Sequence, residues 1–289
     1  MAKKTSFHTE LLKIPKFILL SSKFISFISP KLAILYAAKL FTTPIKHKIP
    51  KREVHMDRDS IQKSVAIPKL KKQVVVYQYG QSEKKVLLVH GWSGRGTQLV
   101  KIADELLKSG YSTVSFDAPA HGKSTGNNGI LTDFIATILE IDKQYGPFDA
   151  AVGHSLGGIS ILNAIKQGLK LQSASIISSG DIVQDIIEDF INKLELKPNF
   201  AIGLRLHFEK KHGEKMNEYS AYKAAKDTNI PLLVIHDKND QDVPVKAGIH
   251  IHKHAQNGTL MLTEGLGHRK ILGNHEVIDR VVTFTINNN

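Results

Sequence analysis

The sequence contains no cysteine among its 289 residues. Disulfides, thiolate metal sites and a cysteine nucleophile are therefore excluded, and any covalent catalysis must use another residue. The apolar share of 42% and the charged share of 23% are ordinary for a folded globular protein, so the composition does not indicate disorder. At this length the simplest interpretation is one α/β catalytic domain plus an extension.

Long apolar runs are also missing from the N-terminal region, although it is rich in apolar residues. Between residues 11 and 41, lysines and prolines interrupt the chain, and the longest charge-free stretches there are residues 24–30 and 32–38. A membrane-spanning helix needs about 20 mostly apolar residues, and a secretory signal needs an uninterrupted apolar core. The sequence predicts neither here, and we expect a cytoplasmic protein.

Acidic residues are scarce in the first quarter of the chain. Residues 1–72 contain 16 Lys+Arg against 4 Asp+Glu, whereas residues 73–289 contain 23 of each, so the whole net charge of +12 lies in the first part. A body with balanced charge lacks the wide basic face that binds nucleic acid phosphates. We therefore expect no nucleic acid partner.

The N-terminal region predicts two amphipathic basic helices, at about residues 16–29 and 30–41. Such helices commonly bury their apolar face against their own domain, and this is the interpretation we favour. The alternative is that they lie on an anionic membrane surface, which would make the protein peripherally membrane-bound. Residues 43–72 predict a connector with one short strand, so residues 1–72 form an extension to a catalytic domain at residues 73–289.

From residue 73 onward, short apolar runs alternate with helical patterns, which indicates a mostly parallel sheet flanked by helices. The expected strands are residues 74–79, 86–90, 112–117, 150–153, 173–178, 232–236 and 260–263. The expected helices are residues 97–109, 132–145, 156–168, 245–255 and 276–286. Residues 180–230 also carry helical patterns, and we interpret them as a short helical lid insertion, with plain packing helices as the alternative.

Ser155 is the candidate nucleophile, in a Gly-x-Ser-x-Gly run that joins an expected strand to an expected helix. A serine on such a sharp turn needs small neighbours to avoid clashes, and Gly153 and Gly157 supply them. The helix that begins at Leu156 directs its unpaired N–H groups and positive dipole end toward the point where an oxyanion would form. The run alone is a weak signal, because glycine-rich turns before helices are common.

Several further motifs follow the expected strands in a fixed order. They are His90-Gly91-Trp92-Ser93-Gly94, the stretch at residues 116–124, the turn around Ser155, the loop at residues 237–244 with its Asp-x-x-Val-Pro ending, and the loop at residues 264–268. Together they resemble the α/β-hydrolase superfamily over about residues 73–289. The resemblance implies the α/β-hydrolase fold and a serine-esterase-like activity, and it does not cover the N-terminal extension.

The resemblance also implies roles for individual residues. Asp240 and His268 correspond to the family's acid and base, which together activate the serine hydroxyl. Backbone N–H groups of Trp92 and Leu156 correspond to the oxyanion hole. No metal or organic cofactor is required, and the expected partner is a small-molecule acyl substrate.

Other residues compete for these roles or for a second site. Asp181 follows the strand at residues 173–178 and is the alternative acid, while Asp237 and Asp242 are expected to stabilise their loop or to be solvated. The remaining candidates are His90, Asp117 and His121, expected to brace loops, and His250, His252 and His254, expected on a solvated helix face rather than around a metal.

The expected reaction is hydrolysis of a carboxylic ester through an acyl-enzyme intermediate. A thioesterase or an amidase would use the same residues. A function of another class also stays open, in which the protein binds a small molecule as a sensor without significant turnover. The sequence alone leaves the oligomeric state undefined.

Overall fold

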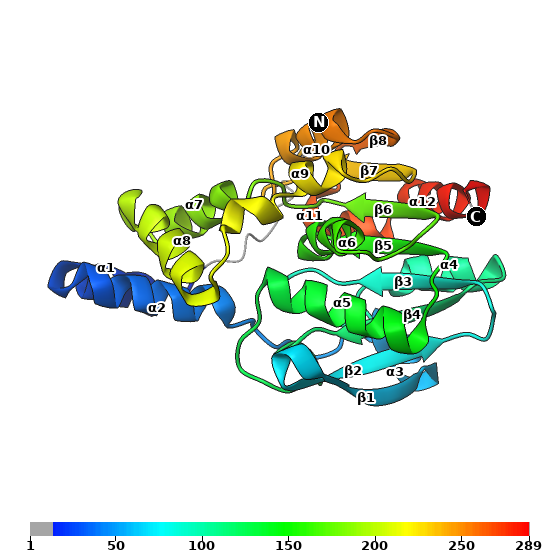
Figure 1. Cartoon of the computed structure of the whole chain (residues 1–289), viewed down its shortest axis with the longest axis horizontal. Helices are drawn as coiled ribbons and strands as arrows, with labels where there is room; N and C mark the ends of the chain where they lie inside the picture. The colour runs from blue at the N-terminus through cyan, green and yellow to red at the C-terminus, as the bar shows by residue number, and fades with distance from the viewer. Residues whose placement is uncertain (1–13, 289) are drawn as a thin grey trace, which may run out of the picture.

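A computed structural model describes residues 14–288. The first 13 residues of the predicted extension and Asn289 at the end of the predicted catalytic domain lie outside the described part. Within it, a central sheet carries helices on both faces, and a further group of helices stands beyond one end of the strands (Figure 1).

The sheet has eight strands in the order β1-β2-β4-β3-β5-β6-β7-β8. The strands are β1 Ile61–Ile67, β2 Lys72–Tyr79, β3 Lys85–Val89, β4 Ser112–Asp117, β5 Ala150–His154, β6 Ser173–Ile177, β7 Leu232–Asp237 and β8 Gly258–Thr263. The pairs β1/β2 and β2/β4 are antiparallel, and every other pair is parallel. The predicted α/β fold with a mostly parallel sheet is therefore confirmed.

The sheet begins at Ile61, earlier than the expected start of the catalytic domain at residue 73. β1 is the edge strand of a hairpin with β2, and only Val65 and Ile67 in it are buried. An edge strand with so few buried side chains carries little apolar patterning, which explains why its sequence resembles a connector.

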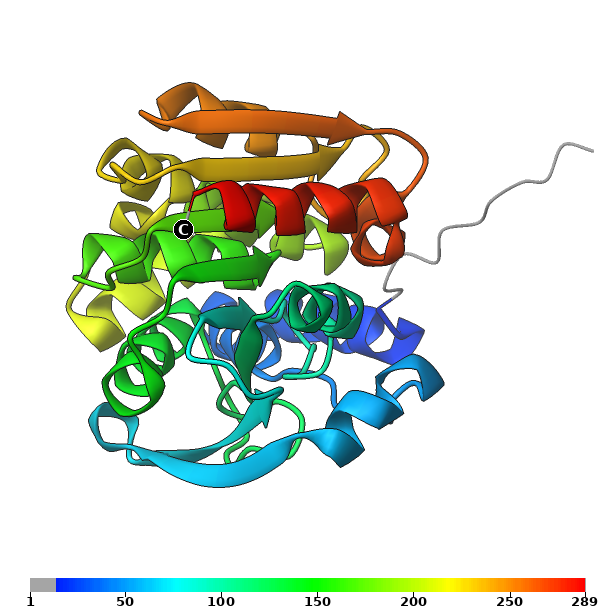
Figure 2. The ribbon, with the colours of Figure 1, turned by 90° about the vertical axis from the view of Figure 1, so that its right-hand side faces the viewer.

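Two helical layers cover the sheet. On one face lie α4 Val100–Lys108 and α12 His275–Asn287, and Figure 2 shows α12, in red, next to β6 and β7. On the other face lie α5 Leu131–Tyr145, α6 Leu156–Lys166 and α10 Lys246–His254. Separate apolar clusters fill the two interfaces, so the central strands are buried on both sides and read as continuous apolar runs.

Shorter elements connect these layers. They are α3 Val54–Asp59, α9 Ala221–Lys226, α11 Gly267–Lys270, and the 3-10 helices η1 Lys51–Glu53, η2 Pro68–Leu70, η3 Met216–Tyr219 and η4 Ile271–Gly273.

Four helices stand together beyond the carboxyl ends of β3 and β6 (Figure 1). They are α1 Lys16–Ile28, α2 Pro30–Thr42, α7 Val183–Lys193 and α8 Asn199–His212. α2 packs on α7 and α8 through Phe41. The Phe41 ring centroid lies 5.0 Å from that of Phe190 on α7 and 5.7 Å from that of Phe208 on α8. We call these four helices the cap. No helix among residues 14–288 has the length and apolar character needed to span a membrane.

Candidate active site

Ser155 sits on a sharp turn between β5 and α6, in a backbone conformation that few non-glycine residues adopt. Its φ and ψ are 53° and −117°, and its N–H donates to the carbonyl of Ile177 at 2.9 Å. A Cβ on Gly153 would lie 2.6 Å from the carbonyl of Gly157, and one on Gly157 would lie 2.2 Å from the Val89 oxygen. Both glycines are thus required for the turn to pack against β3.

Asp240 and His268 meet across two loops that follow β7 and β8. The His268 Nδ1 lies 2.8 Å from Asp240 Oδ2, and the other carboxylate oxygen accepts the N–H groups of Asp242 and Val243, each at 2.9 Å. Burial raises the pKa of Asp240, but the bond and charge of His268 and the Val243 N–H outweigh it and lower this pKa below its usual value. The carboxylate is therefore ionised near neutral pH and fixes the His268 ring.

His154 holds the histidine loop against the turn that carries Ser155. Its Nε2 lies 2.9 Å from the His268 carbonyl oxygen, and the two rings are 4.7 Å apart. Burial lowers the pKa of His154 to about 3, so this ring is neutral and donates its Nε2–H. Since His154 immediately precedes Ser155, the contact holds the His268 backbone beside the turn that carries Ser155. Sequence reasoning gave His154 no role, because a residue inside the turn has no pattern that distinguishes it.

Asp181, the competing acid, is engaged elsewhere. Its Oδ2 lies 2.5 Å from His250 Nδ1 on α10, and its Oδ1 accepts the N–H of Tyr222 at 2.9 Å. His250 in turn contacts the ring of His254 at 4.5 Å. Among residues 14–288 no group of three or more potential ligands is arranged to hold a metal ion. The structure thus brings Asp240, and not Asp181, to His268.

The other two acids of the loop after β7 also point away from His268. Asp237 accepts the Thr263 hydroxyl at 2.7 Å and the Leu266 N–H at 3.0 Å, so it ties the two loops together. Asp242 lies 3.9 Å from the guanidinium of Arg269. Both positions match the expected loop-stabilising or solvated roles.

His90 braces the loop after β3. It is buried, with Nδ1 2.7 Å from the Gly91 carbonyl and Nε2 3.0 Å from the Ala118 N–H. Nδ1 therefore carries the proton, and burial keeps the His90 pKa well below its usual value. A Cβ added to Gly91 would lie 3.0 Å from the Ser155 Cβ, so this loop packs directly on the serine.

The two predicted oxyanion donors, the backbone N–H groups of Trp92 and Leu156, lie in the loop after β3 and at the start of α6. The Gly91 N–H is already engaged, because it donates to the Gln98 side chain at 2.9 Å. The next N–H along the loop is that of Trp92. Leu156 is the first residue of α6, so its N–H has no acceptor within the helix. Within the described part of the chain, neither Trp92 N–H nor Leu156 N–H donates to another backbone group outside the regular elements.

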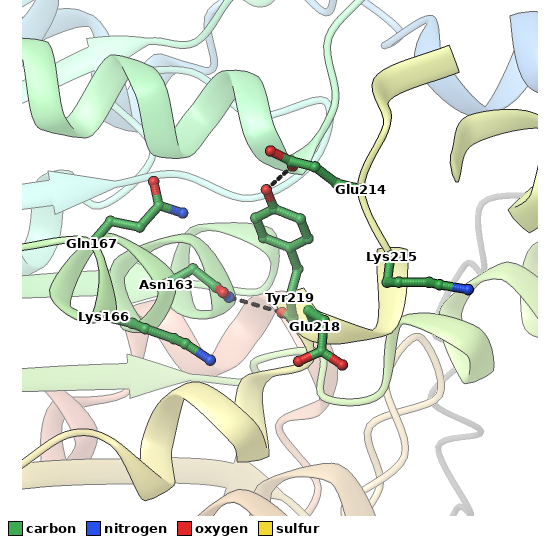
Figure 3. Close-up of a pocket in the computed structure, with 7 residues that line it drawn as sticks. All are labelled: Asn163, Lys166, Gln167, Glu214, Lys215, Glu218 and Tyr219. Atoms are coloured by element: carbon green, nitrogen blue, oxygen red, sulfur yellow. Dashed lines mark hydrogen bonds between the residues drawn. The ribbon is translucent and has the colours of Figure 1, made fainter. Parts of the chain in front are cut away.

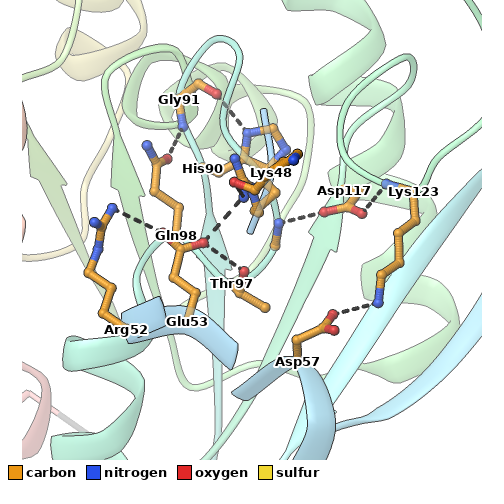
Figure 4. Close-up of polar contacts among 12 residues, drawn as sticks. Lys48, Arg52, Glu53, Asp57, His90, Gly91, Thr97, Gln98, Asp117 and Lys123 are labelled. Carbon is orange, nitrogen blue, oxygen red and sulfur yellow. Dashed lines mark hydrogen bonds and ion pairs between the residues drawn. The ribbon is translucent and has the colours of Figure 1, made fainter. Parts of the chain in front are cut away.

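The N-terminal segment holds the same loop from its other side (Figure 4). Glu53 is buried and accepts the Thr97 hydroxyl at 2.9 Å, while Arg95 lies 3.9 Å from the Glu53 carboxylate. Arg95 also donates to the Lys48 carbonyl at 2.7 Å. Sequence reasoning missed Glu53, because a single acid in a basic stretch shows no motif.

Asp117 joins three chain segments beside this loop. It accepts the N–H groups of Gly96 and Lys123, each at 2.7 Å, and Figure 4 shows Asp117 beside Lys123. It also accepts the Tyr77 hydroxyl at 2.9 Å. Burial raises the pKa of Asp117, although these hydrogen bonds act in the opposite direction. This is the bracing role expected from the sequence.

Two surface pockets lie away from Ser155. One is at the opposite end of α6, where Asn163 donates to the Tyr219 carbonyl at 2.8 Å and the Tyr219 hydroxyl bonds to Glu214 (Figure 3). The other lies between α2 and α8. None of the predicted catalytic residues lines either pocket.

The Alpha/beta hydrolase family model matches residues 86–213, which include the loop after β3 and the turn around Ser155. This segment is therefore similar to that family, and the chain has the α/β-hydrolase fold. No curated protein sequence matches the chain.

Solved structures share the fold of this chain. An esterase from Exiguobacterium antarcticum is 17% identical with a TM-score of 0.62, over 78% of this chain and 100% of that one. A bromoperoxidase from Bacillus anthracis is 16% identical with a TM-score of 0.61, over 78% and 100%. The mouse α/β-hydrolase domain-containing protein 10 is 16% identical with a TM-score of 0.60, over 78% and 97%. At such identities the likeness shows the fold alone.

Proposed function

We propose that this protein is a serine hydrolase that cleaves a carboxylic ester through Ser155, His268 and Asp240. The observation that carries the proposal is the 2.8 Å contact between Asp240 and His268, whose loop His154 ties to the turn that bears Ser155. A serine, an imidazole and an ionised carboxylate in this order are the parts needed for acyl transfer.

In the first stage, His268 Nε2 takes the hydroxyl proton of Ser155 as its oxygen attacks the acyl carbon. The N–H groups of Trp92 and Leu156 stabilise the oxyanion of the tetrahedral intermediate, and loss of one such donor typically lowers the rate by about a hundred- to a thousandfold. His268 then protonates the leaving alcohol, and an ester between Ser155 and the acyl group remains.

In the second stage, His268 removes a proton from water, which attacks the acyl-enzyme ester. Collapse of the second tetrahedral intermediate breaks the bond to Ser155, returns the proton to its oxygen and releases the acid. Asp240 stays ionised throughout and keeps the His268 Nδ1 proton in place. The reaction uses only side chains, backbone donors and water.

We further propose that the insertion at residues 180–230, which contains α7 and α8 of the cap, acts as a short lid over this site. In support, α7 and α8 of the predicted insertion stand beyond the carboxyl ends of the strands, where the loops that carry Ser155, Asp240 and His268 also begin. Ligands of open α/β sheets commonly bind at that edge. The short insertion favours small or medium acyl groups.

The proposal is tested with p-nitrophenyl esters of increasing chain length, and with matching thioesters and amides. We expect the esters to be hydrolysed fastest and Ser155→Ala to abolish turnover without changing the circular dichroism spectrum. Equal turnover by wild type and Ser155→Ala would reject the proposal. Folded protein that binds such compounds but turns none of them over would favour a sensor.

A further inference from the structure

The outer face of α1 is apolar and exposed to solvent. Phe27 is 90% exposed, and the other large apolar side chains on this face are between 59% and 70% exposed. They are Phe17, Leu20, Phe24 and Ile28. Their spacing of three and four residues places them in one stripe along the helix. A monomeric protein rarely leaves so many large apolar side chains together in water.

The stripe is held in place by the rest of the cap. The Ser21 hydroxyl of α1 lies 2.9 Å from the Tyr36 hydroxyl of α2, and Lys23 forms an ion pair with Glu195 after α7. α2 is anchored in turn, because a Cβ on Gly203 of α8 would lie 2.5 Å from the Ile34 side chain. The apolar stripe is therefore part of a packed unit and continues onto α2 through exposed Leu32 and Leu35.

Charge indicates what covers this face. No aspartate or glutamate occurs between residues 11 and 52, whereas exposed Lys16, Lys31 and Lys39 border the apolar side chains. Lys39 also lines the pocket between α2 and α8 together with Lys211 and His207, and none of the residues that line it is acidic. Apolar side chains bordered by lysines fit the acyl and phosphate layers of an anionic bilayer.

We propose that the exposed face of α1 and α2 docks the protein on an anionic lipid surface. The large apolar residues enter the headgroup region, and the lysines contact the phosphates. Because the cap stands at the edge of the sheet where the Ser155 loop begins, docking brings that edge near the lipid (Figure 1). The binding itself does not depend on catalysis, so Ser155→Ala protein is expected to bind equally well.

Flotation of the purified full chain with vesicles tests the proposal. We expect flotation with phosphatidylcholine vesicles that contain phosphatidylserine, little with phosphatidylcholine alone, and weaker binding as salt is raised. Replacing Phe17, Phe24 and Phe27 together by Asp is expected to lower partitioning by more than about a hundredfold. Lys16→Glu with Lys31→Glu is expected to remove the preference for phosphatidylserine.

Ile286→Asp is the matched control, because Ile286 is an exposed apolar residue on α12, away from the cap. It is expected to float like the wild type. Thermal unfolding and turnover of a water-soluble ester are expected to be unchanged in the Phe-to-Asp, Lys-to-Glu and Ile286→Asp variants. Failure of the wild type to float, or unchanged flotation of the Phe-to-Asp variant, overturns the proposal. The proposal is also overturned if the wild type is a dimer that binds no vesicles and the Phe-to-Asp variant is a monomer.

Discussion

At the scale of single residues, the choice between Asp240 and Asp181 depends on which histidine each one contacts. Both acids follow parallel strands, so the sequence alone leaves either one as the partner of the base. Both are also buried in the structure, so burial does not distinguish them. The three-dimensional arrangement separates them, because His268 lies 2.8 Å from Asp240 while Asp181 faces His250. Only an acid that fixes the base contributes to proton transfer from Ser155.

Asp240→Asn is therefore expected to lower kcat/KM for an ester by roughly a thousand- to ten-thousandfold, because the amide no longer fixes the His268 tautomer. Asp181→Asn is the matched control and is expected to change kcat/KM by less than about tenfold. Steady-state kinetics with folded variants provide the measurement. A large loss at Asp181 with little at Asp240 would reverse the assignment.

Gly157→Ala tests the packing of the turn itself. The added methyl would lie 2.2 Å from the Val89 carbonyl oxygen and 2.8 Å from that of His90, both backbone atoms that cannot move aside. We expect a loss of at least about 2 kcal/mol in the free energy of unfolding. Gly168→Ala, where no atom lies within 4 Å, separates this effect from the cost of adding a methyl. Because Gly168 has a φ of 109°, the loss of stability in Gly168→Ala reports backbone strain alone, without a steric clash.

At the scale of elements, the N-terminal segment supports the loop that carries the proposed oxyanion donor, Trp92. Glu53 in η1 holds Thr97, and Arg95 reaches the Lys48 carbonyl, so a segment outside the resemblance contacts the site. The Ile45 N–H also donates to the Ser93 hydroxyl at 3.0 Å. The segment between α2 and β1 thus contacts the loop after β3, in addition to linking the cap to the sheet.

Glu53→Gln is expected to cost about 1.5–3 kcal/mol of stability, because a buried charged acceptor is lost. It is also expected to lower kcat several-fold with little change in KM, since the Trp92 N–H would be held less firmly. Glu264→Gln breaks an exposed pair with Lys238 and is the control, with an expected effect below about 1 kcal/mol. Equal effects of the two substitutions on stability and kcat would contradict this role of Glu53.

The sequence predicts the central elements well, because parallel strands buried on both faces and amphipathic helices leave strong patterns. It also singles out Asp240 and His268, which lie in loops after strands and which the structure places 2.8 Å apart. It predicts one short strand in the connector, but not that this strand, β1, joins the sheet, because its side chains are mostly exposed. Nor does it predict the contacts of Glu53 and His154, which depend on segments far apart in the sequence.

At the scale of the whole molecule, buried histidines set how stability responds to acid. Burial lowers the pKa of His121 to about 4 and that of His154 to about 3, and it also lowers the His90 pKa well below its usual value. The folded pKa values therefore lie below the value of about 6.5 in the unfolded chain. As pH falls through that value, the unfolded chain takes up protons first, and stability that is full above it is lost.

Comparison with His121→Asn isolates one of these groups. Asn can still donate to the Pro119 carbonyl, which accepts from His121 at 2.9 Å, but it does not titrate. Between about pH 7 and about pH 5 we expect the wild type to lose roughly 2 kcal/mol more than the variant in urea unfolding. Parallel pH profiles for the two proteins would show that His121 is not buried in its neutral form.

The most direct test of the central claim is labelling of the folded protein with a fluorophosphonate, followed by mass spectrometry of its peptides. We expect a phosphonyl adduct on Ser155 alone, formed quickly in the wild type and at least about a hundredfold more slowly in His268→Gln. An unlabelled Ser155 in folded protein, or a rate that does not depend on His268, would contradict it.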